Sequence, residues 1–345
     1  MRVMNWNIEH MNSWWEGGNA DPPVMRESFS GSNFSPAVGD IPDLAQRVGN
    51  VISAVDPDVV TIQEGAGIPE MKDFFNRFVE GDSWQIQRGA GGAQALVVAA
   101  RTDRHVSGFE AGPEIAGGID LSQPFQADVD GNLELADLKF TRKPQVVQLV
   151  AHDHPLLIVN NHLKSKFVAS GRQLFKAGGE KRKKFFEGSL INRRRISAEA
   201  FRLRTFLDEL FIADPQAQVL VTGDLNDGPG ADFFETNFLT HSVVDRVFGS
   251  IFYPERQLIH ALFQSGSTDF TAKFFDFIVD EERELVLDHI GLSQAIDHHW
   301  TWHGRVAVEE FEAQIDEEAT VERDRHPSDH RPVVLEMTPN DCRND

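Results

Sequence analysis

The chain of 345 residues carries a formal net charge of −21, and 41% of its residues are hydrophobic. This apolar content suffices for a large core, whereas the negative charge argues against a protein that coats nucleic acid non-specifically. The single cysteine, Cys342, excludes a disulfide within the chain, and no apolar run is long enough to predict a transmembrane helix. Asn5 interrupts the amino-terminal apolar run too early for a signal peptide, so the chain as it stands is predicted to be cytoplasmic, or secreted if a signal peptide has been removed.

Short apolar runs, taken in chain order, predict strands that alternate with helices. The predicted strands are residues 2–8, 59–62, 95–101, 144–151, 156–160, 218–222, 285–292 and 332–337. The predicted helices are residues 42–55, 69–78 and 192–210. Segments rich in turn residues predict a long loop over 11–40 and an insertion over 111–131, and the acidic stretch 308–324 is predicted to be a surface helix or loop. This alternation is typical of an α/β protein, whether layered or doubly wound.

Polar side chains stand at the ends of several predicted strands. They include Asn7, Glu64, His162, Asp224, Asn226, Asp288, Asp329 and His330. Each signal is weak by itself, because such residues after a strand usually form a turn or a solvated loop. Together they predict a shared site, because strand ends converge at one edge of a sheet, where hydrolases place their chemistry.

Six segments resemble the ordered motifs of one protein family. They are Asn-Trp-Asn-Ile at 5–8, Pro-Asp-Val-Val-Thr-Ile-Gln-Glu at 57–64, Asn-Asn-His-Leu-Lys-Ser at 160–165, Gly-Asp-Leu-Asn at 223–226, Leu-Asp-His-Ile at 287–290 and Ser-Asp-His-Arg-Pro at 328–332. The chain therefore resembles the endonuclease/exonuclease/phosphatase superfamily, which includes DNase I, the abasic-site endonucleases, neutral sphingomyelinases and inositol polyphosphate 5-phosphatases. The resemblance runs from residue 5 to 334 in family order, and Phe-Thr-Arg-Lys-Pro at 140–144 resembles an arginine motif of the DNase I branch.

The resemblance implies a DNase I-like fold, which is a four-layer α/β/β/α sandwich. It implies a single domain over residues 1–345, with loop insertions near 11–40, 105–135 and 165–190. The abasic-site endonucleases have a tyrosine where this chain has His162, and the only tyrosine, Tyr253, lies in no matching motif. The chain is therefore predicted to lie nearer the DNase I and sphingomyelinase branches.

The oxygen-rich residues of these motifs predict a metal site. Glu64 is the first candidate ligand, with Asn7 beside it and Asp329 as a third. Hard oxygen ligands suit Mg²⁺ or Mn²⁺, with Ca²⁺ as a further candidate. A zinc site would require more His or Cys at fixed spacing.

The resemblance also implies a catalytic set. Its members are His162, Asp224, Asn226, Asp288 and His330. Asp224 would orient or deprotonate the attacking water, and Asn226 would donate a hydrogen bond to that water or to a phosphate oxygen. Histidines have intrinsic pKa values near neutrality, which suits proton transfer or transition-state stabilisation, and Asp288 would keep His330 cationic.

Basic residues predict where the substrate phosphate binds. Arg142 and Lys164 are the candidates for this contact. Lys164 begins a segment, residues 164–204, that holds 13 Lys and Arg against 3 Asp and Glu, a local charge of +10. A charge run is usually a solvated helix face. Because this basic segment begins two residues after His162, its near end is predicted to lie at the mouth of the site.

Other residues admit simpler interpretations. His10 is expected to have a loop role rather than to line the site, and His298-His299-Trp300 is expected to pack or to lie on the surface. Trp14 and Trp15 could stack on a substrate ring or pack the long loop down, and the sequence favours neither.

Three functions are compatible with these features. The favoured function is a metal-dependent nuclease or related phosphodiesterase that acts on an anionic substrate such as DNA or RNA. The alternative is a phosphoesterase that acts on a phospholipid headgroup, an inositol phosphate or another small phosphoester. A binding module without catalysis is least favoured, because every expected catalytic residue is present. The sequence leaves the oligomeric state open.

Overall fold

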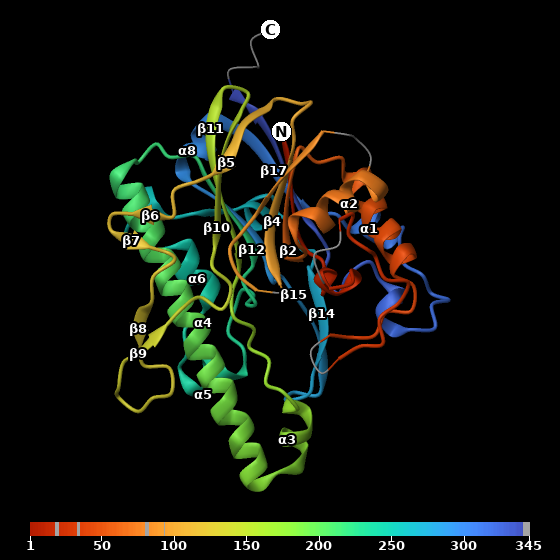
Figure 1. Cartoon of the computed structure of the whole chain (residues 1–345). Coiled ribbons are helices and arrows are strands. Elements are labelled where there is room, and N and C mark those ends of the chain that lie inside the picture. The colour runs from red at the N-terminus through yellow and green to blue at the C-terminus, as the bar shows by residue number, and fades with distance from the viewer. Residues whose placement is uncertain (18–20, 33–34, 80–82, 93, 341–345) are drawn as a thin grey trace.

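Two six-stranded β-sheets form the centre of the protein in its computed structural model (Figure 1). The structure describes residues 1–17, 21–32, 35–79, 83–92 and 94–340. The first sheet has the strand order β17 (Trp300–Val306), β18 (Val333–Pro339), β1 (Arg2–Asn7), β2 (Val59–Gly65), β4 (Ala95–Arg101) and β3 (Trp84–Arg88). The second has the order β13 (Ile259–His260), β16 (Asp288–Leu292), β12 (Val219–Asp224), β11 (His154–His162), β10 (Gln145–Ala151) and β5 (Val106–Ala111).

Successive side chains on the central strands point into different apolar layers. On β1, Val3 packs between the two sheets, whereas Met4 packs on the outer side of the first sheet. On β12, Leu220 packs between the sheets, whereas Val219 and Val221 pack on the outer side of the second. Strands that are buried on both faces are apolar throughout, which explains why short apolar runs marked them in the sequence.

Helices cover both outer faces. The first sheet is covered by α1 (Ile41–Val55) and α2 (Ile68–Phe78), and the second by the long helix α4 (Gly179–Ala213) and by α6 (Val243–Phe248) (Figure 1). The predicted four-layer α/β/β/α sandwich is confirmed. None of the described helices is long and apolar enough to cross a membrane.

The sequence explains where α1 begins and ends. The Asp40 carboxylate accepts a hydrogen bond from the backbone N–H of Asp43 at 3.0 Å, an N-terminal cap that contributes about 1 kcal/mol in typical helices. Leu44, Val48 and Ile52 form the buried stripe of this helix. It ends at Asp56, whose backbone is left-handed with φ of 52°.

The remaining elements are short. They are η1 (Met11–Trp14), β6 (Ile115–Ala116), β7 (Ile119–Asp120), β8 (Phe125–Ala127), β9 (Ala136–Leu138), α3 (Gly171–Ala177), α5 (Phe233–Phe238), η2 (Pro254–Arg256), α7 (Ala261–Gln264), β14 (Ala272–Asp276), β15 (Glu281–Leu285), α8 (Gln294–His299), α9 (Val308–Glu312) and η3 (Glu322–Arg325). The elements α9 and η3 lie at the two ends of the acidic stretch 308–324. This stretch therefore contains both helix and loop. The strands β14 and β15 form a hairpin outside both large sheets.

Two predicted boundaries are wrong. The helix predicted at 192–210 begins earlier, at Gly179. The prediction missed the first half of this helix because that half is polar on most sides and lacks a long apolar stripe. The strand predicted at 285–292 is two strands, β15 and β16. The Thr271 hydroxyl oxygen accepts hydrogen bonds from the backbone N–H groups of Leu287, at 2.9 Å, and Asp288, at 3.1 Å, where β15 gives way to β16.

Candidate active site

The polar strand ends meet at one edge of the two sheets. In the second sheet, His162 on β11 is in register with Asp224 on β12, which is in register with Asp288 on β16. In the first sheet, Asn7 at the end of β1 is in register with Gln63, the neighbour of Glu64 on β2. Ladder pairing therefore places these residues side by side, as the sequence predicted.

Asp224 lies at the centre of this group. Its Oδ2 accepts a hydrogen bond from Asn7 Nδ2 at 3.0 Å and lies 3.5 Å from His162 Nε2. Its Oδ1 accepts a hydrogen bond from the backbone N–H of Asn226 at 2.7 Å. Burial raises the pKa of the Asp224 carboxyl to about 7, although the nearby His330 opposes that rise. Asp224 is thus a buried carboxyl that titrates near neutral pH.

The turn that presents Asp224 requires particular residues. Gly223 has φ of +138°, and a Cβ there would lie 2.0 Å from the carbonyl oxygen of Asn161, so only glycine fits. Asn226 has φ of 51°, a conformation that asparagine tolerates well. The Asn226 Nδ2 donates to the carbonyl of Leu163 at 3.0 Å, and this bond ties the turn to the end of β11.

Asp288 and His330 form a buried pair. His330 Nδ1 lies 2.6 Å from Asp288 Oδ2. Burial lowers the pKa of His330, but Asp288, Asp329 and Asp224 raise it by more, and the pKa lies well above its ordinary value. The backbone of His330 is anchored, because Trp6 Nε1 donates to its carbonyl at 2.8 Å. His330 is therefore held as a cation at neutral pH.

His162 has the opposite character. Burial, together with the positive charges of Arg142 and His330, lowers its pKa well below the ordinary value. Its Nε2 lies 3.9 Å from Glu64 Oε1, and its Nδ1 is buried without a hydrogen-bond partner among the described residues. The site thus holds one neutral and one cationic imidazole.

Glu64 and Asn7 offer oxygen atoms that fit a hard cation. Asn7 Oδ1 is buried and accepts no hydrogen bond from any described residue, while the amide nitrogen is oriented by Asp224. Glu64 Oε2 accepts a hydrogen bond from the backbone N–H of His10 at 2.9 Å. An orphaned amide oxygen near a carboxylate matches the donor set that Mg²⁺ and Mn²⁺ prefer.

A second set of groups could also hold a cation. Within the described part of the chain, ligand atoms of Asp224, Asp288 and His330 lie within 4.8 Å of one another. The buried Asn7 Oδ1, which has no hydrogen-bond partner among the described residues, favours Asn7 and Glu64 instead, because Asp288 Oδ2 is already engaged by His330. Asp329 lies at the rim with its side chain 56% exposed, and its Oδ1 is 3.9 Å from His330 Nε2.

The site contains residues that the sequence did not single out as functional. His10 is a loop residue, as expected, but its loop brings Nδ1 to 3.4 Å from Glu64 Oε2. Glu9 pairs with Arg323 at 2.7 Å, and burial, together with Asp329, raises the pKa of Glu9 to about 7. The only feature of the sequence that indicated a role for these two residues is that they directly follow the Asn-Trp-Asn-Ile motif at 5–8.

Arg142 and Lys164 lie on adjoining loops that one glutamate joins. Glu199 on α4 accepts hydrogen bonds from the backbone N–H of Thr141 at 2.8 Å and from that of Lys164 at 2.9 Å. Arg142 is largely buried and donates to the side-chain oxygen of Gln94 at 3.1 Å. Burial lowers the pKa of Arg142 below its ordinary value, and the carboxylates of Glu64, Asp224 and Glu199 offset only part of that change. Glu199 therefore positions both predicted phosphate contacts. The sequence did not predict this role, because Glu199 lies within a helix and in none of the motifs.

Buried amides connect the two sheets beneath the site. Gln63 Nε2 donates to Asn5 Oδ1 at 2.9 Å and to Asn160 Oδ1 at 2.7 Å. Because Asn5 and Gln63 belong to the first sheet and Asn160 to the second, this network fixes the two strand-end groups relative to each other.

The structure also shows the surroundings of Trp14 and Trp15 and of the basic segment 164–204. Trp14 and Trp15 are buried, and their rings stack with centroids 6.1 Å apart, so they pack the long loop down. Arg193, in the middle of the basic segment, is buried and ion-paired with Asp232. That arginine belongs to the protein's own packing, whereas Lys164 lies near the site.

Known proteins resemble this chain in sequence pattern and in fold. A model of the Endonuclease/Exonuclease/phosphatase family matches residues 4–330. The structure of D. rerio TDP2 complexed with single strand DNA product is 15% identical, with a TM-score of 0.50 and 98% of each chain covered. An endonuclease/exonuclease/phosphatase family protein from Bacteroides thetaiotaomicron is 14% identical, with a TM-score of 0.50, 98% of this chain covered and 94% of that chain. At such identities the structural likeness shows the fold alone. No curated protein sequence matches the chain.

Proposed function

Because the chain belongs to the endonuclease/exonuclease/phosphatase family, we propose that it is a divalent-metal-dependent phosphodiesterase that directs water in line at phosphorus. The observation that carries the proposal is geometric: His162 Nε2 lies 3.5 Å from Asp224 Oδ2, and ligand atoms of Asp224, Asp288 and His330 lie within 4.8 Å of one another in the described part of the chain. Two imidazoles in different protonation states and a carboxyl that titrates near neutrality are what proton transfer at pH 7 requires.

Each member of the set has a role that follows from its environment. Asp224, with a pKa of about 7, accepts the proton of the attacking water. Asn226 Nδ2 donates to the Leu163 carbonyl at 3.0 Å, and its second hydrogen, which lies toward Asp224 Oδ2 at 3.3 Å, is the one that would turn to the water or to a phosphate oxygen. His330, kept protonated by Asp288, donates to the phosphate oxygen on which negative charge develops.

The phosphate of a diester is a monoanion that cationic groups must hold. Arg142 offers a planar guanidinium and Lys164 an ammonium group at the end of β11. A bound Mg²⁺ or Mn²⁺ would neutralise phosphate charge as a Lewis acid, held by Asn7 and Glu64 with Asp329 at the rim. Ca²⁺ suits the same oxygen atoms with looser geometry.

The favoured substrate is a polymeric phosphodiester, DNA or RNA. The proposal is supported by the two cationic side chains of the predicted phosphate contact, Arg142 and Lys164, whose segments Glu199 joins. Polyanion binding releases counterions, so turnover of such a substrate falls steeply as salt is added.

A panel of substrates tests this function. Single-strand DNA, double-strand DNA, RNA and bis-p-nitrophenyl phosphate are incubated with Mg²⁺, Mn²⁺ or EDTA. We expect metal-dependent hydrolysis that EDTA abolishes and, for the nucleic acids, a decline of about tenfold in affinity between 50 and 200 mM salt if Arg142 and Lys164 each hold one phosphate. Absence of turnover on every substrate would contradict the proposal.

A second candidate function is hydrolysis of a small or amphiphilic phosphoester. One observation favours it, because a largely apolar cavity adjoins the catalytic groups. Nucleic acid left intact while small esters are hydrolysed would select this function.

A further inference from the structure

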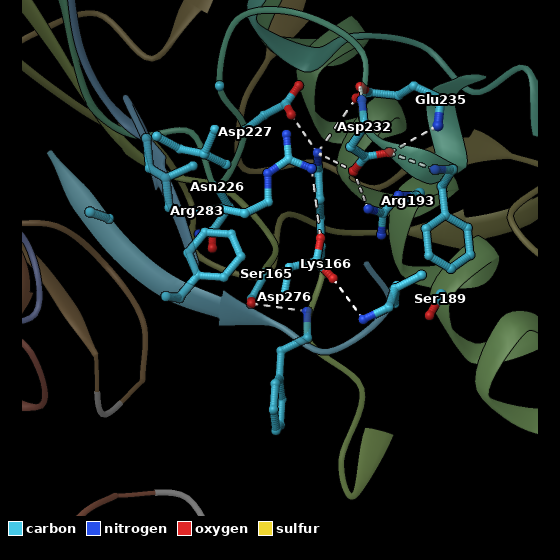
Figure 2. A pocket seen from close by; sticks show the side chains of 18 of the residues that line it. Ser165, Lys166, Ser189, Arg193, Asn226, Asp227, Asp232, Glu235, Asp276 and Arg283 are labelled. Atoms are coloured by element: carbon cyan, nitrogen blue, oxygen red, sulfur yellow. Dashed lines mark hydrogen bonds and ion pairs between the residues drawn. The ribbon is translucent and has the colours of Figure 1, made fainter. Parts of the chain in front are cut away.

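A cavity of about 680 Å³ opens directly beside the catalytic groups. Asn226, Asp329 and His330 line the end that adjoins the active site. From there the cavity extends between the segment after β11, helix α4, the turn before α5 and the β14–β15 hairpin (Figure 2). Its volume lies within the range of small-molecule sites and far exceeds what water or a bare leaving oxygen requires.

Phenylalanine side chains form much of the apolar part of the cavity wall. Six phenylalanines line it: Phe167, Phe185, Phe234, Phe274, Phe275 and Phe277. Three of them are buried or half-buried and pack as a cluster, with ring centroids of Phe185 and Phe277 5.5 Å apart and those of Phe185 and Phe234 6.2 Å apart. The hairpin residues Phe274 and Phe275 are 42% and 43% exposed. Exposed rings continuous with a buried aromatic wall are typical of a site that takes an apolar ligand.

The charged groups of the wall are paired with one another. Lys166 Nζ contacts Asp227, lies 3.4 Å from Asp232 Oδ2 and lies 3.5 Å from Glu235 Oε1 (Figure 2). Arg193 pairs with Asp232 and lies over the Phe234 ring at 4.1 Å from its centroid. Each of these cations has a carboxylate partner, so the apolar surface is the feature that distinguishes this cavity.

We propose that this cavity binds a hydrophobic substituent of the substrate, an alkyl or aryl group that is joined to the scissile phosphate through an ester oxygen. Contiguity supports the assignment, because a phosphate beside His330 directs one of its ester substituents into the cavity. Size supports it as well, since an apolar cavity of about 150 Å³ already holds one benzene ring. The inference deepens the second candidate function, hydrolysis of a small or amphiphilic phosphoester, and it rests on the proposed function for the position of the phosphate.

A homologous series of diesters tests the cavity. Methyl, butyl, hexyl and phenyl p-nitrophenyl phosphate share one leaving group. In each case the oxygen of water bonds to phosphorus and the bond between phosphorus and the p-nitrophenyl oxygen breaks. The products are p-nitrophenolate and the alkyl or aryl phosphate. We expect kcat/KM to rise about threefold for each added methylene, on the order of a hundredfold from methyl to hexyl, as apolar surface leaves water. Equal values for methyl and hexyl would overturn the inference, and comparison of hexyl with phenyl shows whether chain or ring is preferred.

Variants locate the effect in the wall. In the Phe274→Ala/Phe275→Ala variant the ratio of hexyl to methyl turnover should fall about tenfold, because two rings of the mouth are lost. Ala231→Trp, at an exposed position of the lining, should lower the same ratio by filling space. Phe252→Ala is the matched control, because Phe252 is 82% exposed and does not line the cavity. The same ratio in all three variants and the wild type would contradict the assignment.

Binding without turnover separates this inference from the proposed function. Calorimetry in EDTA compares methylphosphonate with hexylphosphonate, which are not hydrolysed. Tighter binding of hexylphosphonate by tenfold or more, lost in Phe274→Ala/Phe275→Ala, would support the cavity even if no diester were hydrolysed. Turnover of every diester without dependence on chain length would instead support the catalytic site and refute the cavity.

Discussion

The floor and the wall of the candidate site are built in different ways. The floor consists of strand ends, where ladder register places His162, Asp224 and Asp288 side by side and buried amides fix the two sheets. The wall consists of the segment after β11, part of α4, the turn before α5 and the β14–β15 hairpin, which lie outside both sheets. A change in the floor disturbs several hydrogen bonds at once, whereas the wall can change without altering the ladders. We infer that the floor determines the reaction and the wall determines which ester is chosen.

The largest effect is expected from His330→Ala. Loss of the cationic imidazole should lower kcat about a thousandfold on bis-p-nitrophenyl phosphate, because positioned proton donors contribute roughly 10²–10⁴-fold. Steady-state kinetics measures the loss, with Phe252→Ala as a variant outside the floor. A kcat within about threefold of the wild type would show that the floor does not depend on this histidine.

Asp288→Asn should lower activity less and change its pH dependence. His330 has a raised pKa, so its charged form is present at neutral pH and is lost as pH rises through that pKa. Without the Asp288 charge the pKa falls, and the alkaline limb of the kcat/KM profile should move to lower pH. The acid limb, which reflects Asp224 near pH 7 in the wild type, should move less. An unchanged alkaline limb would exclude His330 as the group that must stay protonated.

Glu199→Gln should have a smaller effect that appears mainly in KM. The substitution weakens the carboxylate hydrogen bonds to Thr141 and Lys164 and so loosens both predicted phosphate contacts. An increase in KM of about tenfold is expected, since hydrogen bonds to charged groups contribute about 1.5–3 kcal/mol. Glu187→Gln, at an exposed position of the same helix, is the control. Equal KM values for the two variants would refute the positioning role.

The smallest effect is expected at the far end of the basic segment. Lys181, Lys183 and Lys184 are exposed on the first turns of α4, and their combined replacement by Gln should change nuclease activity less than about twofold at 0.15 M salt. Lys164→Gln, near the phosphate contacts, should lower it about fivefold. A larger loss in the triple variant, measured on single-strand DNA, would mean that the substrate extends along α4.

The sequence predicted the floor well because its signals are local. The apolar run before Glu64 and the Gly-Asp-Leu-Asn turn at 223–226 each combine a buried strand with polar residues at its end, and register then brings the ends together. The family and the four-layer fold followed from the order of these motifs and are confirmed, whereas the nearer relation to the DNase I branch stays a prediction.

The wall could not be predicted in the same way. Apart from one isolated bridge between Ala272 and His330, the described residues of its strands β14 and β15 pair only with each other, and the hairpin residues are half exposed, so no continuous apolar run marks them. The edge strands β3 and β5 were missed for the same reason. Glu199 and His10 reach the floor through tertiary contacts, which depend on where α4 and the first loop pack rather than on neighbouring residues.

Hydrolysis of bis-p-nitrophenyl phosphate during a metal titration tests the central claim most directly. The wild type should show turnover that appears with Mg²⁺ or Mn²⁺ and disappears with EDTA, and Glu64→Gln should need at least about tenfold more metal for half-maximal rate, since an ionised oxygen ligand is lost. Turnover that persists in EDTA, or a Glu64→Gln titration that coincides with the wild type, would contradict a metal-dependent site centred on Glu64.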